Sequence, residues 1–225
     1  MACLFIVATP IGNLKDISLR ALECLKGADL VACEDTRRSL KLLNHYGIKK
    51  PLMSCHAHNE GKSASRVVAL LREGKDVAYL SDAGTPGISD PGQRLVRQAR
   101  DAGFPVVPLP GPSAFAALAS VSGCAGKTLV FEGFLSPRPG RRRSRLRELL
   151  DSGEAFILYE SVHRIIKLLA DLADLEPERV VLLGREMTKE FEEYLEGPAG
   201  EILREATGKN LKGEFSVLVF GRKKS

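Results

Sequence analysis

Residues 80–92 read LSDAGTPGISDPG and combine three glycines with two prolines. An apolar run precedes them at residues 77–80, and apolar residues at helical spacing follow at Leu95, Val96 and Ala99. This pattern predicts a loop between a strand and a helix. Because aspartate followed by proline is typical of a helix start, Asp90 is the expected N-cap and Pro91 the expected first helical residue.

The composition and the length of this loop favour a ligand site over an ordinary connection. Glycine allows a ligand to lie directly against the backbone, and proline holds the surrounding dihedral angles fixed. Connections between a strand and a helix usually take about two to six residues, and this one is longer. We therefore expect a small-molecule site at the carboxyl end of the strand.

Short apolar runs alternate with helical periodicity throughout the first half of the chain. Strands are predicted at residues 4–7, 30–33, 51–55, 77–80 and 106–109. This alternation predicts an α/β fold with a mostly parallel sheet that is covered on both faces. A polar cluster follows each of the first four strands, and the carboxyl ends of parallel strands share one edge, so the clusters are expected to converge.

The alternation pauses at Pro110-Gly111-Pro112-Ser113, which predicts a domain boundary. Residues 1–112 are assigned to an N-terminal α/β domain and residues 113–225 to a C-terminal α/β domain. In the second half, strands are predicted at residues 128–131, 155–159, 180–183 and 215–220, with another near Tyr194. The short connections near the end of the chain indicate antiparallel pairs, so this sheet is expected to be mixed.

Composition excludes several classes of protein. The chain has 225 residues, of which 44% are hydrophobic and 27% charged, as in soluble globular proteins. Residues 1–8 carry no basic residue, and their apolar run stops at Thr9-Pro10, which predicts a first strand rather than a signal peptide or a membrane span. The five cysteines are far apart and form no CxxC pair, which favours reduced thiols in the cytoplasm over a disulfide or zinc framework.

Positive charge is concentrated in two places. Six arginines fall within residues 138–147, and the sequence ends with the basic run Arg222-Lys223-Lys224. Leu146, Leu149 and Leu150 predict one packed side for the arginine helix. A solvated face is the ordinary interpretation of such a run, but like charges repel and no acid precedes Glu148, which favours binding to an RNA backbone. The arginines expected to be free are Arg141, Arg142, Arg143 and Arg145.

Several common catalytic motifs are missing. The sequence has no complete Walker loop, no GxGxxG after the first strand and no GxSxG element. His56 and His58 have the His-x-His spacing of a metal pair, but no third ligand stands at a recognisable distance. Hydrogen bonding or RNA contact is therefore the favoured role of these histidines, and no metal is expected.

Nine segments in order carry a resemblance to a known family: IVATPIGNLKDISLRAL, CEDTRRS, SCHAHNE, LSDAGTPGISDPG, PLPGPSA, FEGFL, YESVHR, GREMTKEFEE and GEFSVLVFG. Together they resemble the ribosomal RNA small subunit methyltransferase I family of the tetrapyrrole methylase superfamily. Relatives that methylate tetrapyrroles carry a GxGPGD-type first loop, from which ATPIGN at residues 8–13 departs as expected for the RNA branch.

The resemblance implies S-adenosylmethionine-dependent 2'-O-methylation of a cytidine in the decoding region of 16S ribosomal RNA. It also implies a homodimer of two-domain subunits with the cofactor held in the cleft between the domains. By motif position, the implied cofactor-binding residues are Pro10, Ile11, Gly12, Asp82, Ala83, Gly84, Thr85, Ile88, Ser113, Ala114, Tyr159, Glu186 and Met187. Members of this family often continue into a basic C-terminal segment, so with an end at Ser225 the arginine helix and the dimer are expected to carry more of the RNA binding.

A ribose hydroxyl is a weak nucleophile at neutral pH and needs a group that removes its proton. Candidates at the predicted edge are Glu34, Asp35, His56, His58 and Glu186. Histidine has the best unperturbed pKa for this task, and a carboxylate could equally orient an arginine, so the choice stays open. Residues 34–37 also have the pattern of an ordinary helix N-terminus.

Other residues are candidates for contact with the RNA. Arg37 and Arg185 are the candidates for holding a phosphate next to the reacting ribose. Phe134 and Tyr159 are the aromatic residues that could stack on an exposed cytidine. The arginines expected at the RNA backbone are Arg138, Arg141, Arg142, Arg143 and Arg145.

Two other functions compete with this one. A methyltransferase that acts on a small molecule such as a tetrapyrrole would have no use for an arginine helix. An RNA-binding relative without catalysis would have damaged cofactor loops, whereas these loops are intact in the sequence.

Overall fold

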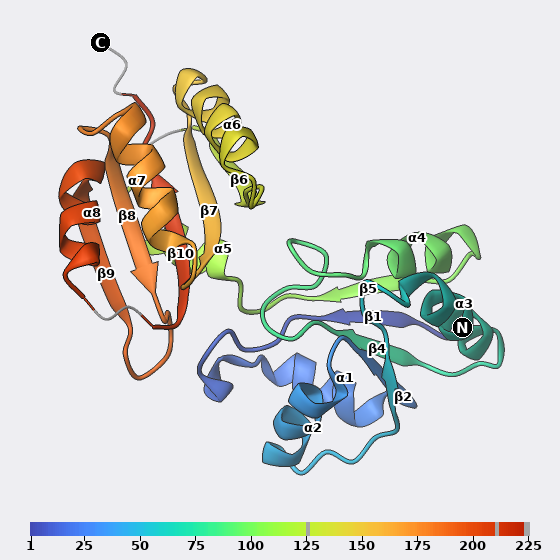
Figure 1. Cartoon of the computed structure of the whole chain (residues 1–225). Coiled ribbons are helices and arrows are strands. Elements are labelled where there is room, and N and C mark those ends of the chain that lie inside the picture. The colour runs from blue at the N-terminus through green and yellow to red at the C-terminus, as the bar shows by residue number, and fades with distance from the viewer. Residues whose placement is uncertain (125–126, 210–211, 223–225) are drawn as a thin grey trace. The chain divides into compact units, whose positions relative to one another are not determined.

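The computed structural model describes residues 1–124, 127–209 and 212–222, so Lys223 and Lys224 of the basic chain end lie outside it (Figure 1). The chain divides into two compact units, Met1–Ser113 and Ala114–Ser225. The sequence pattern placed this division one residue earlier, after Pro112.

Residues 1–113 are all described, and they contain one five-stranded parallel sheet in the order β3-β2-β4-β1-β5. Its strands are β1 (Leu4–Val7), β2 (Leu30–Cys33), β3 (Leu52–Ser54), β4 (Val77–Leu80) and β5 (Val106–Leu109). All four residues of β4 are buried, as is typical of a central strand covered on both faces. The predicted parallel sheet is therefore confirmed.

Helices cover both faces of this sheet, as Figure 1 shows. They are α1 (Leu19–Gly27), α2 (Thr36–His45), α3 (Glu60–Arg72) and α4 (Gln93–Asp101), and a short 3-10 turn, η1 (Leu14–Asp16), precedes α1. Leu25 of α1 and Leu43 of α2 belong to the core on one face, whereas Val67 of α3 and Leu95 of α4 belong to the core on the other.

The start of α4 differs from the sequence-based prediction. The helix begins at Gln93 with Gly92 as its N-cap, so the prediction of Asp90 as N-cap and Pro91 as first residue is wrong. Instead the buried Glu60 carboxylate of α3 accepts hydrogen bonds from the Gly92 and Arg94 amides, both at 2.9 Å. A Cβ at Gly92 would lie 2.7 Å from Tyr79 Cε1, and φ there is +126°, so this position requires glycine.

The described part of the second unit forms a mixed five-stranded sheet in the order β6-β7-β10-β8-β9. Its strands are β6 (Leu129–Phe134), β7 (Ala155–Ser161), β8 (Val180–Arg185), β9 (Glu193–Pro198) and β10 (Glu214–Val219). β6 and β7 are parallel, whereas β10 is antiparallel to both β7 and β8, and β8 is antiparallel to β9. The predicted mixed sheet is confirmed.

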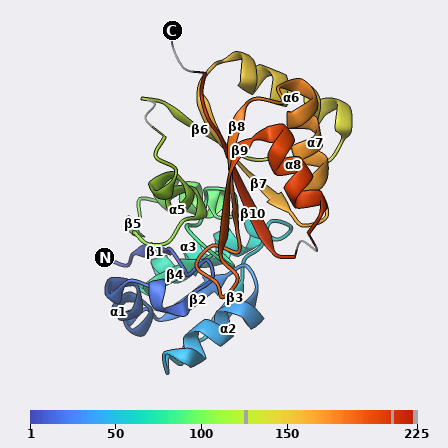
Figure 2. The same cartoon turned by 90° about the vertical axis from the view of Figure 1, so that its left-hand side faces the viewer.

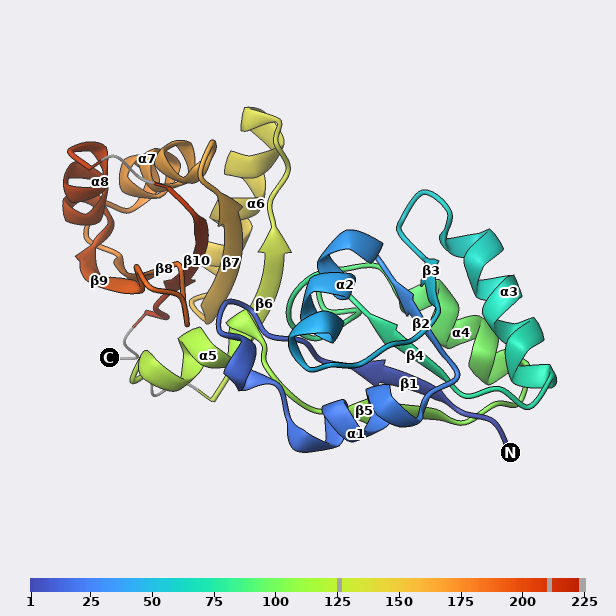
Figure 3. The same ribbon diagram turned by 90° about the horizontal axis from the view of Figure 1, so that it is seen from below.

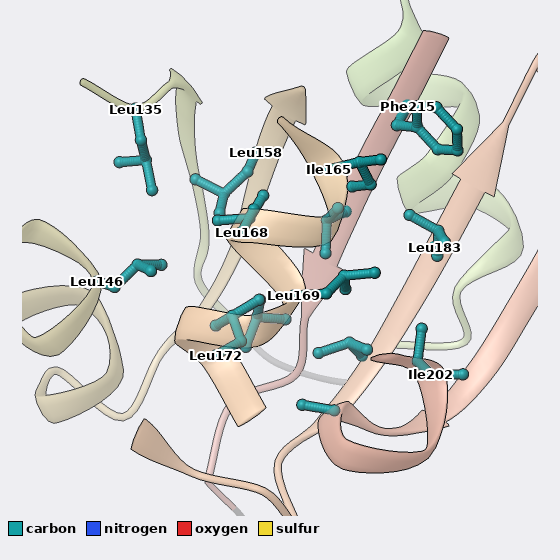
Figure 4. Packing of buried hydrophobic residues seen from close by; sticks show 14 of the residues in the cluster. Leu135, Leu146, Leu158, Ile165, Leu168, Leu169, Leu172, Leu183, Ile202 and Phe215 are labelled. Atoms are coloured by element: carbon teal, nitrogen blue, oxygen red, sulfur yellow. The ribbon is translucent and has the colours of Figure 1, made fainter. Parts of the chain in front are cut away.

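Three helices of this unit, α6 (Pro139–Asp151), α7 (Ile165–Leu175) and α8 (Ala199–Thr207), lie on one side of its sheet in the described part of the chain (Figure 2). Leu146, Leu169 and Ile202 from these helices pack with Leu158 and Phe215 from the strands in one buried cluster (Figure 4). The remaining helix, α5 (Ala114–Val121), lies on the opposite side of the same sheet (Figure 3). No helix in the described residues is long and apolar enough to cross a membrane.

Candidate functional site

The loops that follow β1, β4 and β5 are joined by hydrogen bonds at the carboxyl edge of the parallel sheet. The Thr9 amide donates to the Gly84 carbonyl at 2.8 Å, and the Gly84 amide donates back to the Thr9 carbonyl at 3.0 Å. The Thr85 hydroxyl donates to the Pro112 carbonyl at 3.0 Å. The structure thus brings together residues 8–12, 82–85 and 110–113, as the strand pattern predicted for this edge.

Two glycines allow this close approach of the loop backbones. Gly84 has φ of +79°, and a Cβ there would lie 3.5 Å from Ile11 Cγ2. A Cβ at Gly111 would lie 3.1 Å from Ala8 Cβ. Ile88 of the same loop is 39% exposed, so an apolar side chain lies open beside these hydrogen-bonded loops. An exposed aliphatic side chain next to polar loop residues fits a ligand that has both polar and apolar parts.

Carboxylates gather at the ends of β2 and β4. The Glu34 amide donates to the Leu80 carbonyl at 3.3 Å, and the Asp35 amide donates to Asp82 Oδ1 at 3.0 Å. Burial raises the pKa of the Glu34 carboxyl, and the charges of Asp82 and Asp90 raise it further. Burial and the Asp82 charge likewise raise the pKa of Asp90. This edge therefore holds carboxyl groups that retain protons more readily than free side chains do.

Asp35 and Arg37 form a local unit at the start of α2. Asp35 is the N-cap and accepts from the Arg37 amide at 2.8 Å. Its carboxylate also accepts from the Arg37 guanidinium at 3.1 and 2.7 Å, and these contacts lower the pKa of Asp35. The helix N-terminus interpretation of residues 34–37 is confirmed for Asp35. The Arg37 guanidinium is already engaged by a carboxylate, which weakens its candidacy as a phosphate ligand.

His56 and His58 follow β3 beside the end of β2. The Cys55 amide donates to the Cys33 carbonyl at 2.7 Å, so the loop that carries His56 leaves β3 beside the end of β2. The His56 amide donates to Asn59 Oδ1 at 2.8 Å, and the buried Nδ1 atom of His56 has no hydrogen-bond partner among the described residues. The two imidazole centroids are 6.0 Å apart. The described residues contain no group of three His, Cys, Asp or Glu side chains that could hold a metal ion.

In the second unit, Tyr159 sits in an aromatic cluster. The Phe115 amide donates to the Tyr159 hydroxyl at 2.8 Å, and the ring centroids of Phe131 and Phe134 lie 5.0 and 5.7 Å from that of Tyr159. Phe134 is 55% exposed. Ser113 ends the first unit, and Ala114 begins α5 in the second.

Arg185 ends β8, Glu186 and Met187 follow it, and neighbouring groups hold all three. Arg185 Nε donates to the Lys212 carbonyl at 2.8 Å, and Arg185 Nη1 lies 3.2 Å from Glu193 Oε2. Met187 is buried. The Arg185 guanidinium is thus already satisfied within its own unit, which weakens its candidacy as a phosphate ligand.

Glu186 is likewise bound to its surroundings. Its Oε1 atom accepts from the Glu214 amide at 2.9 Å and from the Lys189 ammonium at 2.8 Å. Burial works against ionisation, but these two donors hold the pKa of the Glu186 carboxyl below its usual range. A carboxylate stabilised in this way is a weak proton acceptor.

The prediction that the arginines of α6 are free is wrong for Arg142, Arg143 and Arg145. Arg142 is buried, and its Nε atom lies 2.6 Å from Asp171 Oδ2. Arg143 pairs with both Asp171 and Asp174.

Arg145 forms two bonds of 2.8 Å to the Glu132 carboxylate and another of 2.8 Å to Glu148. Apart from Glu148, the acids that pair with these arginines come from α7 and β6, which are distant in sequence. A window limited to residues 138–147 therefore could not reveal them. Arg138 and Arg141 have no ion-pair partner within the described ranges and remain candidates for RNA contact.

The fold and the glycine-rich edge define a methylase of the tetrapyrrole class. Residues 3–203 match the family model Tetrapyrrole (Corrin/Porphyrin) Methylases. Among solved structures, the methyltransferase CobJ superposes with a TM-score of 0.73 at 19% identity, over 100% of this chain and 98% of that one. This structural likeness supports the fold.

Curated relatives specify the family further. The ribosomal RNA small subunit methyltransferase I of Haemophilus influenzae is 48% identical over 226 residues, which cover 99% of this chain and 80% of the relative. The Thermotoga maritima protein of the same name is 43% identical and covers 99% of this chain and 100% of the relative. The chain belongs to the ribosomal RNA small subunit methyltransferase I family.

Proposed function

We propose that this chain transfers the methyl group of S-adenosylmethionine to the 2'-oxygen of cytidine 1402 in 16S ribosomal RNA. The observation that carries this proposal is the identity of 48% to a ribosomal RNA methyltransferase across 99% of the chain. The hydrogen-bonded loops after β1, β4 and β5 support it, since they form an intact backbone-lined edge. A small-molecule substrate such as a tetrapyrrole is the competing possibility.

The loop edge of the first unit fits the cofactor. When bound, S-adenosylmethionine supplies a methyl group carried on a positively charged sulfur. We propose that Ile11 and Ile88 contact its apolar parts and that the backbone of residues 82–85 meets its polar parts. The remaining proposed contacts from this unit are Pro10, Gly12 and Ser113, and those from the second unit are Ala114, Tyr159, Glu186 and Met187.

We favour Glu34 as the group that accepts the proton of the ribose hydroxyl. Asp35 is bound to Arg37 and Glu186 to Lys189, so both carboxylates are stabilised in the ionised form. Glu34 has no ion-pair partner among the described residues, and its pKa is raised above the usual 4.5 by burial and by the charges of Asp82 and Asp90. A general base works best when its pKa lies close to the working pH. His56, in the loop after the neighbouring strand β3, is the second choice.

We also propose a macromolecular substrate, an oligomeric state and a compartment for this chain. The substrate is 16S ribosomal RNA, free or within the 30S subunit, and the chain acts as a homodimer in the cytoplasm. Exposed apolar side chains in the second unit, Val121 and Phe134, both 55% exposed, are compatible with a covered surface. Free cysteines suit a reducing compartment.

The experiment is methyl transfer from radiolabelled S-adenosylmethionine to 30S subunits from a strain that lacks its own enzyme, with the labelled nucleotide mapped. Label on the 2'-oxygen of the decoding-region cytidine is the expected result. Thr85→Arg serves as the blocked-site control, because a long side chain at Thr85 would fill the loop edge and abolish both cofactor binding and labelling. Cofactor binding without RNA labelling would favour a small-molecule substrate instead.

A further inference from the structure

A small pocket opens between the loop after β1, helix α2 and the loop after β4. Its volume is about 110 Å³. Three buried hydroxyl-bearing residues, Thr9, Ser39 and Ser81, line its interior, with exposed fractions of 3, 4 and 2%. Arg38 and Lys41, one turn apart on α2, also line it.

The size of the pocket limits what it can hold. Binding sites for drug-sized ligands usually take about 300–1,000 Å³, whereas a cavity that holds one water needs about 10–15 Å³. A volume of about 110 Å³ therefore suits a single small group, such as a tetrahedral oxyanion, and is too small for a whole nucleoside cofactor.

The charges of the pocket favour an anion. Arg38 Nη1 lies 3.4 Å from Asp82 Oδ2, a long contact, and the Arg38 side chain is 62% exposed. Lys41 is exposed and has no ion-pair partner within the described ranges. The lining thus contains two cationic side chains and one carboxylate. By contrast, Arg37 has its bonding groups occupied by Asp35.

The location of the pocket connects it to the reaction. Leu80 of its lining ends β4, and Ser81 and Asp82 follow that strand. Asp82 and Arg38 of the lining are close enough to Glu34 for their charges to act on the pKa of its carboxyl, so the pocket lies near the carboxylate proposed to accept the ribose proton. In an RNA chain, a phosphate is attached to the ribose carbon next to the one that bears the 2'-oxygen.

We infer that this pocket binds a phosphate of the substrate RNA beside the reacting ribose, with Lys41 and Arg38 as its cationic ligands. The inference rests on the proposed function. It assigns the phosphate contact to residues that the sequence pattern did not single out, in place of Arg37 and Arg185. The carboxylate of the cofactor is the other anion that could reach this edge, and the test separates the two sources.

The test compares Lys41→Ala with Lys26→Ala, a matched loss of one positive charge from the last turn of α1, away from the pocket. Methyl transfer to 30S subunits is measured as KM and kcat, RNA affinity as a function of salt, and cofactor affinity by calorimetry. For Lys41→Ala we expect a KM rise of about tenfold, as for one charged hydrogen bond, and a salt slope lower by about 1. Lys41→Arg should restore both values.

Three other experimental outcomes would each rule out either the phosphate pocket or the proposed function. If Lys41→Ala behaves like Lys26→Ala while the wild-type chain methylates RNA, the phosphate pocket is wrong and the proposed function stands. If Lys41→Ala weakens cofactor binding instead of RNA binding, the pocket holds the cofactor carboxylate. If the wild-type chain labels no RNA, the proposed function fails, and this inference fails with it.

Discussion

Glu34 illustrates how the surroundings of one residue change its chemistry. It directly follows the buried strand β2, its carboxyl group is partly removed from water, and Asp82 and Asp90 add negative charge nearby. Arg38 works in the opposite direction but is itself close to Asp82. The net effect is a carboxyl group that gives up its proton less readily than a free glutamate.

This environment predicts a pH-dependent effect of Glu34→Gln on stability. Because the pKa is higher in the folded state than the usual 4.5, ionisation of Glu34 destabilises the fold as pH rises from about that value through the folded-state pKa. Glu34→Gln should therefore have a higher Tm than wild type at pH 8, and the difference should disappear below about pH 4. Thermal unfolding across this range measures it, with Glu23→Gln on the exposed side of α1 as the matched control.

The same variant tests the proposed chemistry. Loss of a general base lowers turnover by about 10²–10⁴-fold with little change in cofactor affinity. Single-turnover methyl transfer and calorimetry measure the two quantities. Full turnover in folded Glu34→Gln would remove Glu34 from the mechanism and leave His56 as the next residue to test.

The arginines of helix α6 fall into two groups, one that forms ion pairs within its own unit and one that is exposed and open to RNA. Arg142 and Arg143 face the acids of α7, and Arg145 faces Glu132 of β6, so these side chains hold the helix to its own unit. Arg138 and Arg141, at the start of the helix, are exposed. The RNA-binding part of α6 is therefore expected to be its first turn.

Two substitutions distinguish the arginines that stabilise the unit from those that bind RNA. Arg142→Ala removes the closest partner of the buried Asp171 and should lower the free energy of unfolding, by less than the about 3–5 kcal/mol of a fully unpaired buried charge because Arg143 still contacts Asp171. Arg141→Ala should change stability by less than about 0.5 kcal/mol but lower the salt slope of RNA binding by about 1. Urea denaturation and RNA titration measure both. Weaker RNA binding by a fully stable Arg142→Ala variant would contradict this division.

Each of the two units contains its own hydrophobic core. The clusters around Leu25 and Val67 lie within residues 1–113, and the cluster around Leu169 lies within the second unit. Because a parallel sheet is stable only when both faces are covered, and α1–α4 cover both faces here, the first unit meets this requirement by itself.

We expect residues 1–113 to fold as an isolated fragment. Dispersed amide resonances and a cooperative urea transition would show this, and the fragment should retain the mutual hydrogen bonds between Thr9 and Gly84 as slowly exchanging amides. A fragment with collapsed, undispersed resonances would show that the first core depends on residues after Ser113.

Much of this architecture is determined by local sequence. Apolar runs separated by helical periodicity predicted all five strands of the first unit, and the glycines and prolines of residues 80–92 predicted the loop edge. The nine ordered segments predicted the methyltransferase family, which the relatives confirm. These features depend on residues close together in the chain, and a sequence pattern records them directly.

The tertiary structure decided which charged side chains have partners within the protein and which are free to bind a substrate. Asp171 reaches Arg142 across 29 positions, and Glu60 reaches the Gly92 amide across 32. The pocket beside α2 combines Thr9, Lys41 and Ser81 from separate segments. Ion pairs, helix caps from distant residues and pockets all depend on distances between helices and strands. Those distances are set only when the chain folds. The sequence thus determined the fold and the family, and folding determined which cations remain open to a substrate.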